Sequence, residues 1–156
     1  VIAMNAMVRA SHVGAHCVIG SSSEITRSYV GDKVWTHTNY IGDSIIGDNC
    51  AFGAGTVTGN LRLDEGTIKV MIKNERLDSK RTKLGVITGK NVRCGINTSI
   101  MPGVKIGSNC FVGAGIVIAE DIEDNMFVYG KTTLTKKKNS SVPNANGREA
   151  LKKKLV

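Results

Sequence analysis

The stretch IGDNCAFGAGTV, residues 46–57, returns almost letter for letter as IGSNCFVGAGIV at residues 106–117. Both copies follow a rule of six residues: an aliphatic leader, usually a glycine, two polar positions, a small or branched residue and one more. The positions that act as leaders along the chain are Val13, Ile19, Ile25, Val30, Thr36, Ile41, Ile46, Phe52, Thr58, Thr88, Cys94, Ile100, Ile106, Val112 and Ile118. Three intervals are one residue short, at Val30, Ile41 and Ile46, and these predict bent corners.

A period of six excludes an amphipathic helix, whose apolar positions recur every 3.6 residues, and it is too long for the alternation of a single strand. It is typical of short strands separated by tight turns, and such repeats predict a β-helix. Three six-residue sides would make one triangular coil, and stacked coils would pair their strands about 4.8 Å apart. We therefore predict an all-β, parallel β-helix with the leaders stacked in its interior.

Residues 59–83 interrupt the repeat, because they lack the glycine-led hexads. Within them, residues 67–72 alternate apolar and polar side chains, which predicts a hairpin strand. We expect one β-helix domain at residues 1–130 with an inserted loop or hairpin at 59–83. A long excursion from a rigid scaffold is a common place for function, although a tolerated surface insertion is the simpler alternative.

The net charge of +8 is concentrated near the C-terminal end. Residues 131–156 hold eight Lys or Arg and one Glu, whereas residues 1–130 are nearly balanced. We interpret residues 131–156 as a solvated basic tail, with a short helix starting near Asn146 or Gly147. Its lysine clusters are also compatible with contact to nucleic acid, a membrane surface or a phosphorylated small molecule. Because the chain begins without Met and already carries a strand-like pattern, we expect it to be a piece of a longer solenoid.

Composition narrows the classes of partner and compartment. The sequence contains neither an apolar run of 18 residues nor a recognisable signal peptide, so we expect no membrane association. Cys17, Cys50, Cys94 and Cys110 occupy inward positions of the repeat without any CxxC pair. We therefore predict buried free thiols and a cytoplasmic location. Separately, we expect no nucleic-acid partner.

The three histidines are candidates for a metal site. Some β-helix trimers, such as the γ-class carbonic anhydrases, bind zinc through a distant histidine followed by a close pair. Here the close pair, His12 and His16, comes first and His37 follows. We therefore predict no metal, and interpret His12 and His16 as surface or corner residues.

The segment HTNYIGDSIIGDNCAFGAGTVTGN, residues 37–60, resembles the acetyltransferase domain of a family of bifunctional enzymes. These enzymes combine a sugar-1-phosphate nucleotidylyltransferase with an amino-sugar-1-phosphate N-acetyltransferase, and the resemblance is to their archaeal branch especially. The similarity continues upstream through NAMVRASH and SSEITRSYVGD, and downstream through NLRLDEGTIKV and KLGVITGKNVRCGINTSIMPGVKIGSNCFVGAG.

The resemblance implies a left-handed β-helix assembled as a homotrimer with active sites between subunits. It implies transfer of acetyl from acetyl-CoA to the 2-amino group of glucosamine 1-phosphate, or also galactosamine 1-phosphate, in UDP-N-acetylhexosamine biosynthesis. It also implies a nucleotidylyltransferase domain that would precede this chain. The handedness comes from the resemblance, since parallel crossovers are usually right-handed.

By matching position, the resemblance implies that His37 is the general base and that Tyr40 and Asn60 hold the amino sugar. Imidazole suits the task because its ordinary pKa lies near neutrality. A satisfied structural histidine is the alternative for His37.

Cations are expected around the sugar phosphate. Arg9 matches the family's phosphate-binding arginine, although Ala10 replaces the proline that follows it there. A lysine common in the family is Thr26 here, with Arg27 adjacent, so Arg27 is a second candidate. Lys69 matches a basic residue of the insertion.

Acetyl-CoA is expected along the glycine-rich repeats. The resemblance places a backbone NH donor for the oxyanion at Ala54 and the CoA arm at Ala114. Lys131 is a candidate for the phosphates of CoA.

Two other functions are compatible with the sequence. The chain could be a non-catalytic β-helix that trimerises or regulates an attached nucleotidylyltransferase. Alternatively, it could be a hexapeptide acyltransferase with another amine acceptor.

Overall fold

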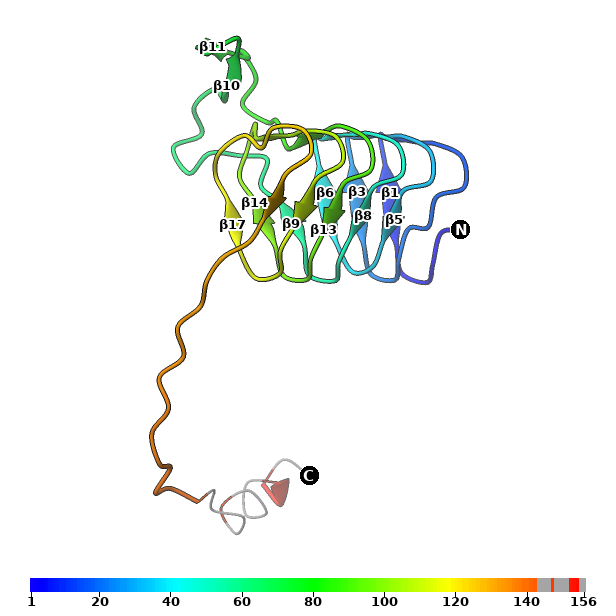
Figure 1. The fold of residues 1–156 in the computed structure, drawn as a ribbon. Helices are drawn as coiled ribbons and strands as arrows, with labels where there is room; N and C mark the ends of the chain where they lie inside the picture. The colour runs from blue at the N-terminus through cyan, green and yellow to red at the C-terminus, as the bar shows by residue number, and fades with distance from the viewer. Residues whose placement is uncertain (143–146, 148–151, 155–156) are drawn as a thin grey trace.

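The computed structural model describes residues 1–142, 147 and 152–154. The chain winds into a left-handed parallel β-helix, which confirms the predicted fold class (Figure 1). Each coil contributes short strands to three parallel sheets, which form the three sides of a prism.

The sides are built from strands of only two or three residues. The first side consists of β1 (Met7–Arg9), β3 (Glu24–Thr26), β6 (Tyr40–Gly42), β9 (Val57–Thr58), β14 (Ser99–Ile100) and β17 (Val117–Ile118). The second side consists of β2 (His12–Val13), β4 (Tyr29–Val30), β7 (Ile45–Ile46), β12 (Ile87–Thr88) and β15 (Lys105–Ile106). The third side consists of β5 (Trp35–Thr36), β8 (Ala51–Phe52), β13 (Arg93–Cys94), β16 (Phe111–Val112) and β18 (Phe127–Val128).

The leaders of the hexads form the interior of the prism. All of them are buried except Val13, which is half-buried in the second coil. Strand pairing keeps them in line, as in the parallel register of Val8 with Ile25 and of Ile25 with Ile41. The core is therefore a continuous stack that no single repeat could bury.

All four cysteines are buried and free, as predicted. Cys17, Cys50 and Cys110 donate weak hydrogen bonds to backbone carbonyls, and Cys94 occupies a leader position in β13.

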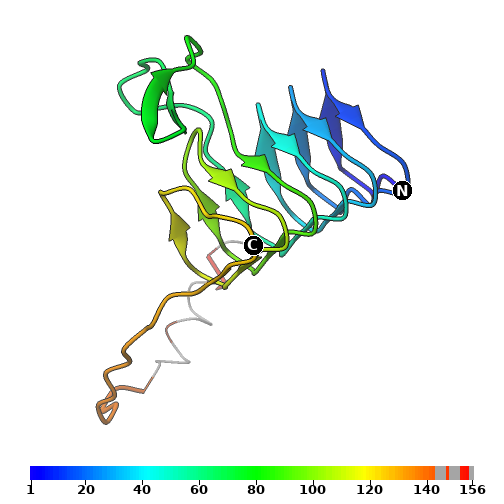
Figure 2. The same ribbon diagram turned by 45° about the horizontal axis from the view of Figure 1, so that its top comes forward.

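The predicted hairpin is confirmed within the insertion. Strands β10 (Lys69–Ile72) and β11 (Glu75–Asp78) pair in antiparallel register and stand away from the coils (Figure 2). A bridge between Leu61 and Lys83 closes the base of the excursion, and Ile68 is buried there. The core continues past the insertion, because Phe52 before it and Val86 after it belong to one buried cluster.

Residues 131–142 have no regular secondary structure and run away from the prism (Figure 1). The predicted C-terminal helix falls mostly on residues 143–146, 148–151 and 155–156, which lie outside the described residues. In the described part of the chain, no helix is long and apolar enough to cross a membrane.

One edge of the prism, between the first and second sides, is tightened by short corners. Ala10, Arg27 and Asp43 stack there with left-handed φ angles of 48°, 48° and 49°. Two of the short sequence intervals contain Arg27 and Asp43, and the third contains His37. Left-handed residues also occur in six-residue intervals, for example at His16 and Lys33, so the bent corners expected from the short intervals stay a prediction.

A column of serine hydroxyls stabilises this edge. The backbone NH of Ser28 donates to Ser11 Oγ at 3.0 Å, Ser44 NH donates to Ser28 Oγ at 3.0 Å, and Val86 NH donates to Ser44 Oγ at 3.1 Å. The corner backbone is therefore satisfied by serines, and the stacked side chains of the residues before them are free for other contacts.

Candidate functional site

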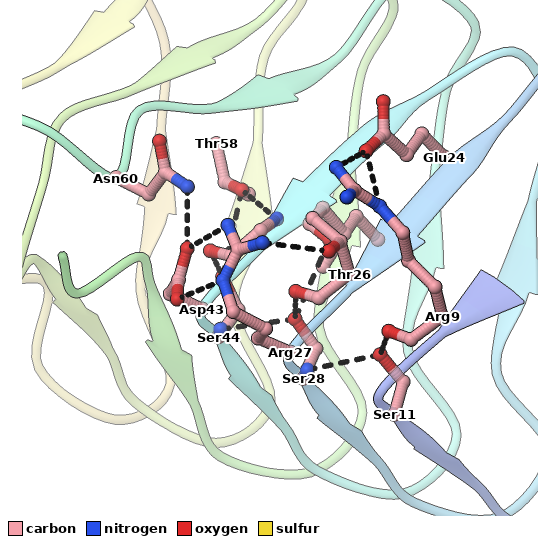
Figure 3. A network of polar contacts seen from close by, with 12 residues as sticks. Arg9, Ser11, Glu24, Thr26, Arg27, Ser28, Asp43, Ser44, Thr58 and Asn60 are labelled. Atoms are coloured by element: carbon pink, nitrogen blue, oxygen red, sulfur yellow. Dashed lines mark hydrogen bonds and ion pairs between the residues drawn. The ribbon is translucent and has the colours of Figure 1, made fainter. Parts of the chain in front are cut away.

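Arg27 and Asp43 form a two-pronged ion pair on the edge between the first and second sides (Figure 3). Arg27 Nε donates to Asp43 Oδ1 at 2.7 Å, and Nη2 donates to Oδ2 at 2.8 Å. Arg27 Nη1 donates to Thr26 Oγ1 at 3.0 Å, so the guanidinium folds back over β3. The Asp43 side chain is only 6% exposed and that of Arg27 37%, which makes the pair a fixed feature rather than a loose surface contact.

Asn60 joins Asp43 to Tyr40. Its Nδ2 donates to Asp43 Oδ2 at 2.5 Å and to the Tyr40 hydroxyl at 3.0 Å. Both hydrogens of the amide are therefore used inside the network, and its Oδ1 is left to accept from elsewhere. Hydrogen bonds thus join Arg27 to Asp43, Asp43 to Asn60 and Asn60 to Tyr40, so four side chains from three successive coils form one polar cluster.

The charges of this cluster stabilise one another. Burial by itself raises the pKa of Asp43. The hydrogen bonds from Arg27 and Asn60 lower this pKa by more than burial raises it, so the pKa lies below its usual range. The hydrogen bond with Asp43 raises the pKa of Arg27. Asp43 is therefore an anion and Arg27 a cation, and together they carry no net charge.

Arg9 lies on the same side of the prism, on β1. Its Nη2 forms an ion pair with Glu24 Oε1 at 2.8 Å, and the Arg9 side chain is 57% exposed (Figure 3). Exposed pairs of this kind contribute little stability and exchange partners readily. Of the two arginines, Arg9 is thus the more available to an incoming anion.

His37 occupies the other edge of the first side, in the corner between β5 and β6. The corner is fixed through backbone and Asn39: His37 NH donates to Asn39 Oδ1 at 2.7 Å, and Ser23 Oγ donates to the His37 carbonyl at 2.5 Å. The histidine itself is exposed. A buried turn thus presents an accessible imidazole.

Ala54 and Ala114 lie on the same edge as His37. Backbone hydrogen bonds stack its corners at 2.9 Å, from Gly55 NH to Thr38 O, from Asn97 NH to Ala54 O and from Gly115 NH to Ile96 O. Both alanines are exposed, and so are Ile96 and Asn97 in the corner between them, so the edge is a track of exposed corner residues running from His37 towards the last coils.

Lys131 follows the last coil close to this track. A Cβ added to Gly113 would lie 3.0 Å from Tyr129 Cβ, and one added to Gly130 would lie 2.9 Å from Ile116. The chain therefore crosses beside Ala114 immediately before Lys131, which is itself exposed.

The structure assembles Arg27, Tyr40 and Asn60 into one network and places Arg9 and His37 elsewhere on the same side of the prism. Lys69 is separate: it starts β10, opposite Asp78, and lines a cleft with Arg76 and Pro102. Within the described residues, no hydrogen bond or ion pair links Lys69 to the network.

Asp43 and Glu24, the anionic partners, were not predicted from the sequence. Asp43 follows Arg27 by 16 residues and precedes Asn60 by 17, which is one coil each way. The spacing of about one coil was therefore the sequence signal that could have placed Asp43 next to Arg27 and Asn60. In the described part of the chain, no group of three or more His, Cys, Asp or Glu side chains could hold a metal ion.

Comparison with known proteins identifies relatives. The family described as the hexapeptide repeat of succinyl-transferase matches residues 44–59 and 85–120, on either side of the hairpin insertion. The bifunctional protein GlmU of Methanocaldococcus jannaschii is 52% identical over 118 residues, which cover 74% of this chain and 28% of that protein.

A second curated relative is the bifunctional sugar-1-phosphate nucleotidylyltransferase/acetyltransferase of Sulfurisphaera tokodaii. It is 45% identical over 106 residues, covering 67% of this chain and 26% of that protein. The chain thus spans less than a third of the length of these relatives and matches their C-terminal parts.

Among solved structures, PerB from Caulobacter crescentus in complex with CoA and GDP-perosamine is similar with a TM-score of 0.61. The identity is 22%, and the match covers 81% of this chain and 53% of PerB. This similarity shows a shared fold.

Proposed function

The chain belongs to the hexapeptide-repeat family, among the acetyltransferase domains of archaeal bifunctional sugar-1-phosphate nucleotidylyltransferases, and on this premise we propose that it acetylates amino sugar phosphates. The donor is acetyl-CoA, and the acceptor is the 2-amino group of glucosamine 1-phosphate or its galactosamine counterpart. One observation carries the proposal: an exposed imidazole lies three residues before Tyr40, whose hydroxyl is fixed by Asn60.

The acceptor binds along the first side of the prism. Tyr40 and Asn60 contact the sugar, and Arg9 exchanges Glu24 for the phosphate. This arrangement holds the amine towards the edge that carries His37, and such positioning supplies much of the rate.

The acceptor must react as the neutral amine, with one proton released to solvent, because a protonated amine has no lone pair to attack a thioester. His37 removes a further proton from the nitrogen as it bonds to the thioester carbonyl carbon. A backbone NH at Ala54 stabilises the oxyanion. Collapse of the intermediate breaks the carbon–sulfur bond, and the departing thiolate takes the proton back from the imidazolium.

CoA follows the track of exposed corners past Ala114, and Lys131 meets its phosphates. A neighbouring protomer closes the other wall of this track, because His37 lies open on a single chain and the reaction benefits from exclusion of water. We therefore expect a homotrimer with its active sites between protomers.

The test is a panel of acceptors with acetyl-CoA, in which release of free thiol is measured. The panel contains glucosamine 1-phosphate, galactosamine 1-phosphate, unphosphorylated glucosamine and an amino acid. Thiol release with an amino sugar phosphate is the expected result, and silence towards both phosphorylated sugars would overturn the proposal.

The variant His37→Ala tests the base. We expect kcat to fall about 10²–10⁴-fold, the usual contribution of a general base. His16→Asn is the matched control, since His16 is another exposed corner histidine with a φ of 59°, which asparagine tolerates. Equal activity of the wild-type and His37→Ala proteins would exclude His37 as the base.

A further inference from the structure

We propose that Asp43 is a positioning residue of the acceptor site, whose carboxylate orients Arg27, Asn60 and, through Asn60, the hydroxyl of Tyr40. The inference rests on the proposed function and concerns residues that touch the acceptor. Its starting point is a buried carboxylate with both oxygens engaged (Figure 3).

The fold does not need a carboxylate at this corner. Ala10 occupies the equivalent corner of an earlier coil with nearly the same φ, 48° against 49°. The serine column satisfies the corner backbone, and Ser44 hydrogen-bonds to Gly42 O and Val86 NH without help from Asp43. The Asp43 side chain is therefore free to serve the cluster above the corner.

Asp43 decides which way the Asn60 amide faces. A carboxylate accepts hydrogen bonds and cannot donate them, so it selects the Nδ2 side of the amide. The same nitrogen then donates to the Tyr40 oxygen at 3.0 Å. Because the Tyr40 oxygen accepts this bond, its own proton remains available to a sugar hydroxyl or phosphate oxygen.

Asp43 also sets the role of Arg27. Its two oxygens hold Nε and Nη2, and Thr26 holds Nη1, so the guanidinium is immobilised and its charge is balanced. Arg27 then acts as a fixed hydrogen-bond donor beside Tyr40. Arg9, with its exposed pair to Glu24, supplies the exchangeable cation.

The variant Asp43→Asn isolates this role. Asparagine has nearly the same shape and is tolerated at left-handed φ, so the corner is retained while the charge and the acceptor-only character are lost. We expect KM for the amino sugar phosphate to rise about tenfold, in line with loss of a charged hydrogen bond. KM for acetyl-CoA should stay within about twofold, because its track follows the opposite edge of this side.

Asp48→Asn is the matched control. Asp48 also follows a glycine, and it pairs with Lys90 at 3.1 Å on a different edge. Neither KM should change in this variant, and its melting temperature calibrates the cost of removing an ion pair from a corner.

The double variant Asp43→Asn with Asn60→Asp returns a carboxylate to the cluster with the two roles exchanged. We expect it to recover part of the acceptor affinity lost in the single variant. If the single variant fails to fold, the double variant still tests the positioning role, because its acceptor KM can be compared with that of the wild-type protein.

The outcomes separate this inference from the proposed function. No wild-type activity towards any amino sugar phosphate would overturn the proposed function. Wild-type activity with an unchanged acceptor KM in Asp43→Asn would overturn the positioning role alone. So would an equal loss for both substrates with a lowered melting temperature, since that describes a merely structural residue.

Discussion

Asn39 ties the His37 corner to the core. Its side chain is buried and makes three hydrogen bonds: Oδ1 accepts from His37 NH, and Nδ2 donates to the carbonyls of Gly53 and Thr56 at 2.8 and 3.0 Å. The amide links this corner to the next coil, where the predicted oxyanion donor lies. One residue thus links the corner of His37, the proposed base, to the coil that carries Ala54, the proposed oxyanion donor.

We expect Asn39→Ala to lower the free energy of unfolding by about 2–4 kcal/mol, because it leaves the His37 NH and the Thr56 carbonyl without the partner that Asn39 provides, whereas the Gly53 carbonyl still accepts from Thr56 NH. Since the corner loosens, kcat should also fall. Urea denaturation at equal protein concentration measures the first effect. Thr38→Ala, a change at the exposed neighbour, should be close to neutral; equal effects of the two substitutions would contradict this account.

At the scale of elements, the coils are stacked so tightly that the interior thiols are shielded. Burial is the main cause that raises the pKa of Cys94 to about 12, with smaller contributions from Cys50 and Cys110. Burial also raises the pKa of Cys50. The reactive thiolate is therefore scarce at neutral pH.

We expect all four cysteines to resist a thiol reagent at pH 8 in the folded protein, and to react fully in guanidinium chloride. Ellman's reagent provides the measurement, and the denatured sample is its control. Rapid modification of any cysteine in the native protein would mean that the stack opens locally.

At the scale of the whole molecule, the third side of the prism carries an outward column with aromatic residues at both ends, separated by Ala51 and Arg93. Trp35, Phe111 and Phe127 are 55%, 55% and 63% exposed, and Phe111 and Phe127 contact each other edge to face. We therefore propose the aromatic residues of this side as part of the interface between protomers. The side shares an edge with His37, so a protomer seated here would help to close the site.

We expect the wild-type protein to have the mass of three chains of 16.6 kDa in multi-angle light scattering. Phe111→Glu places a charge in the column and should shift the protein towards monomer, with loss of acetyl transfer. Tyr29→Glu, on the second side, is the control for a charge at an exposed aromatic position. A monomeric wild-type protein that is fully active would rule out this assembly.

The candidate site was predictable only in part. His37 and Tyr40 are close in sequence and share one corner and strand, so a local motif was enough to propose them together. Arg27, Asp43 and Asn60 are each about one coil apart, and their contact depends on the short corners and on the guanidinium folding back over Thr26. Lys69 was proposed with the same group, but the hairpin carries it away from the network of its own chain.

The sequence by itself determined the β-helix and its interior, because a leader every six residues has to face inward on every coil and buries a continuous stack. It determined the free thiols for the same reason. Only the tertiary structure decided how charges pair: stacking brings residues 16 or 17 apart into contact, and the shape of each corner directs the side chains. The hydrogen bonds of Asp43 with Arg27 and Asn60 depend on that geometry, and the six-residue pattern alone does not predict them.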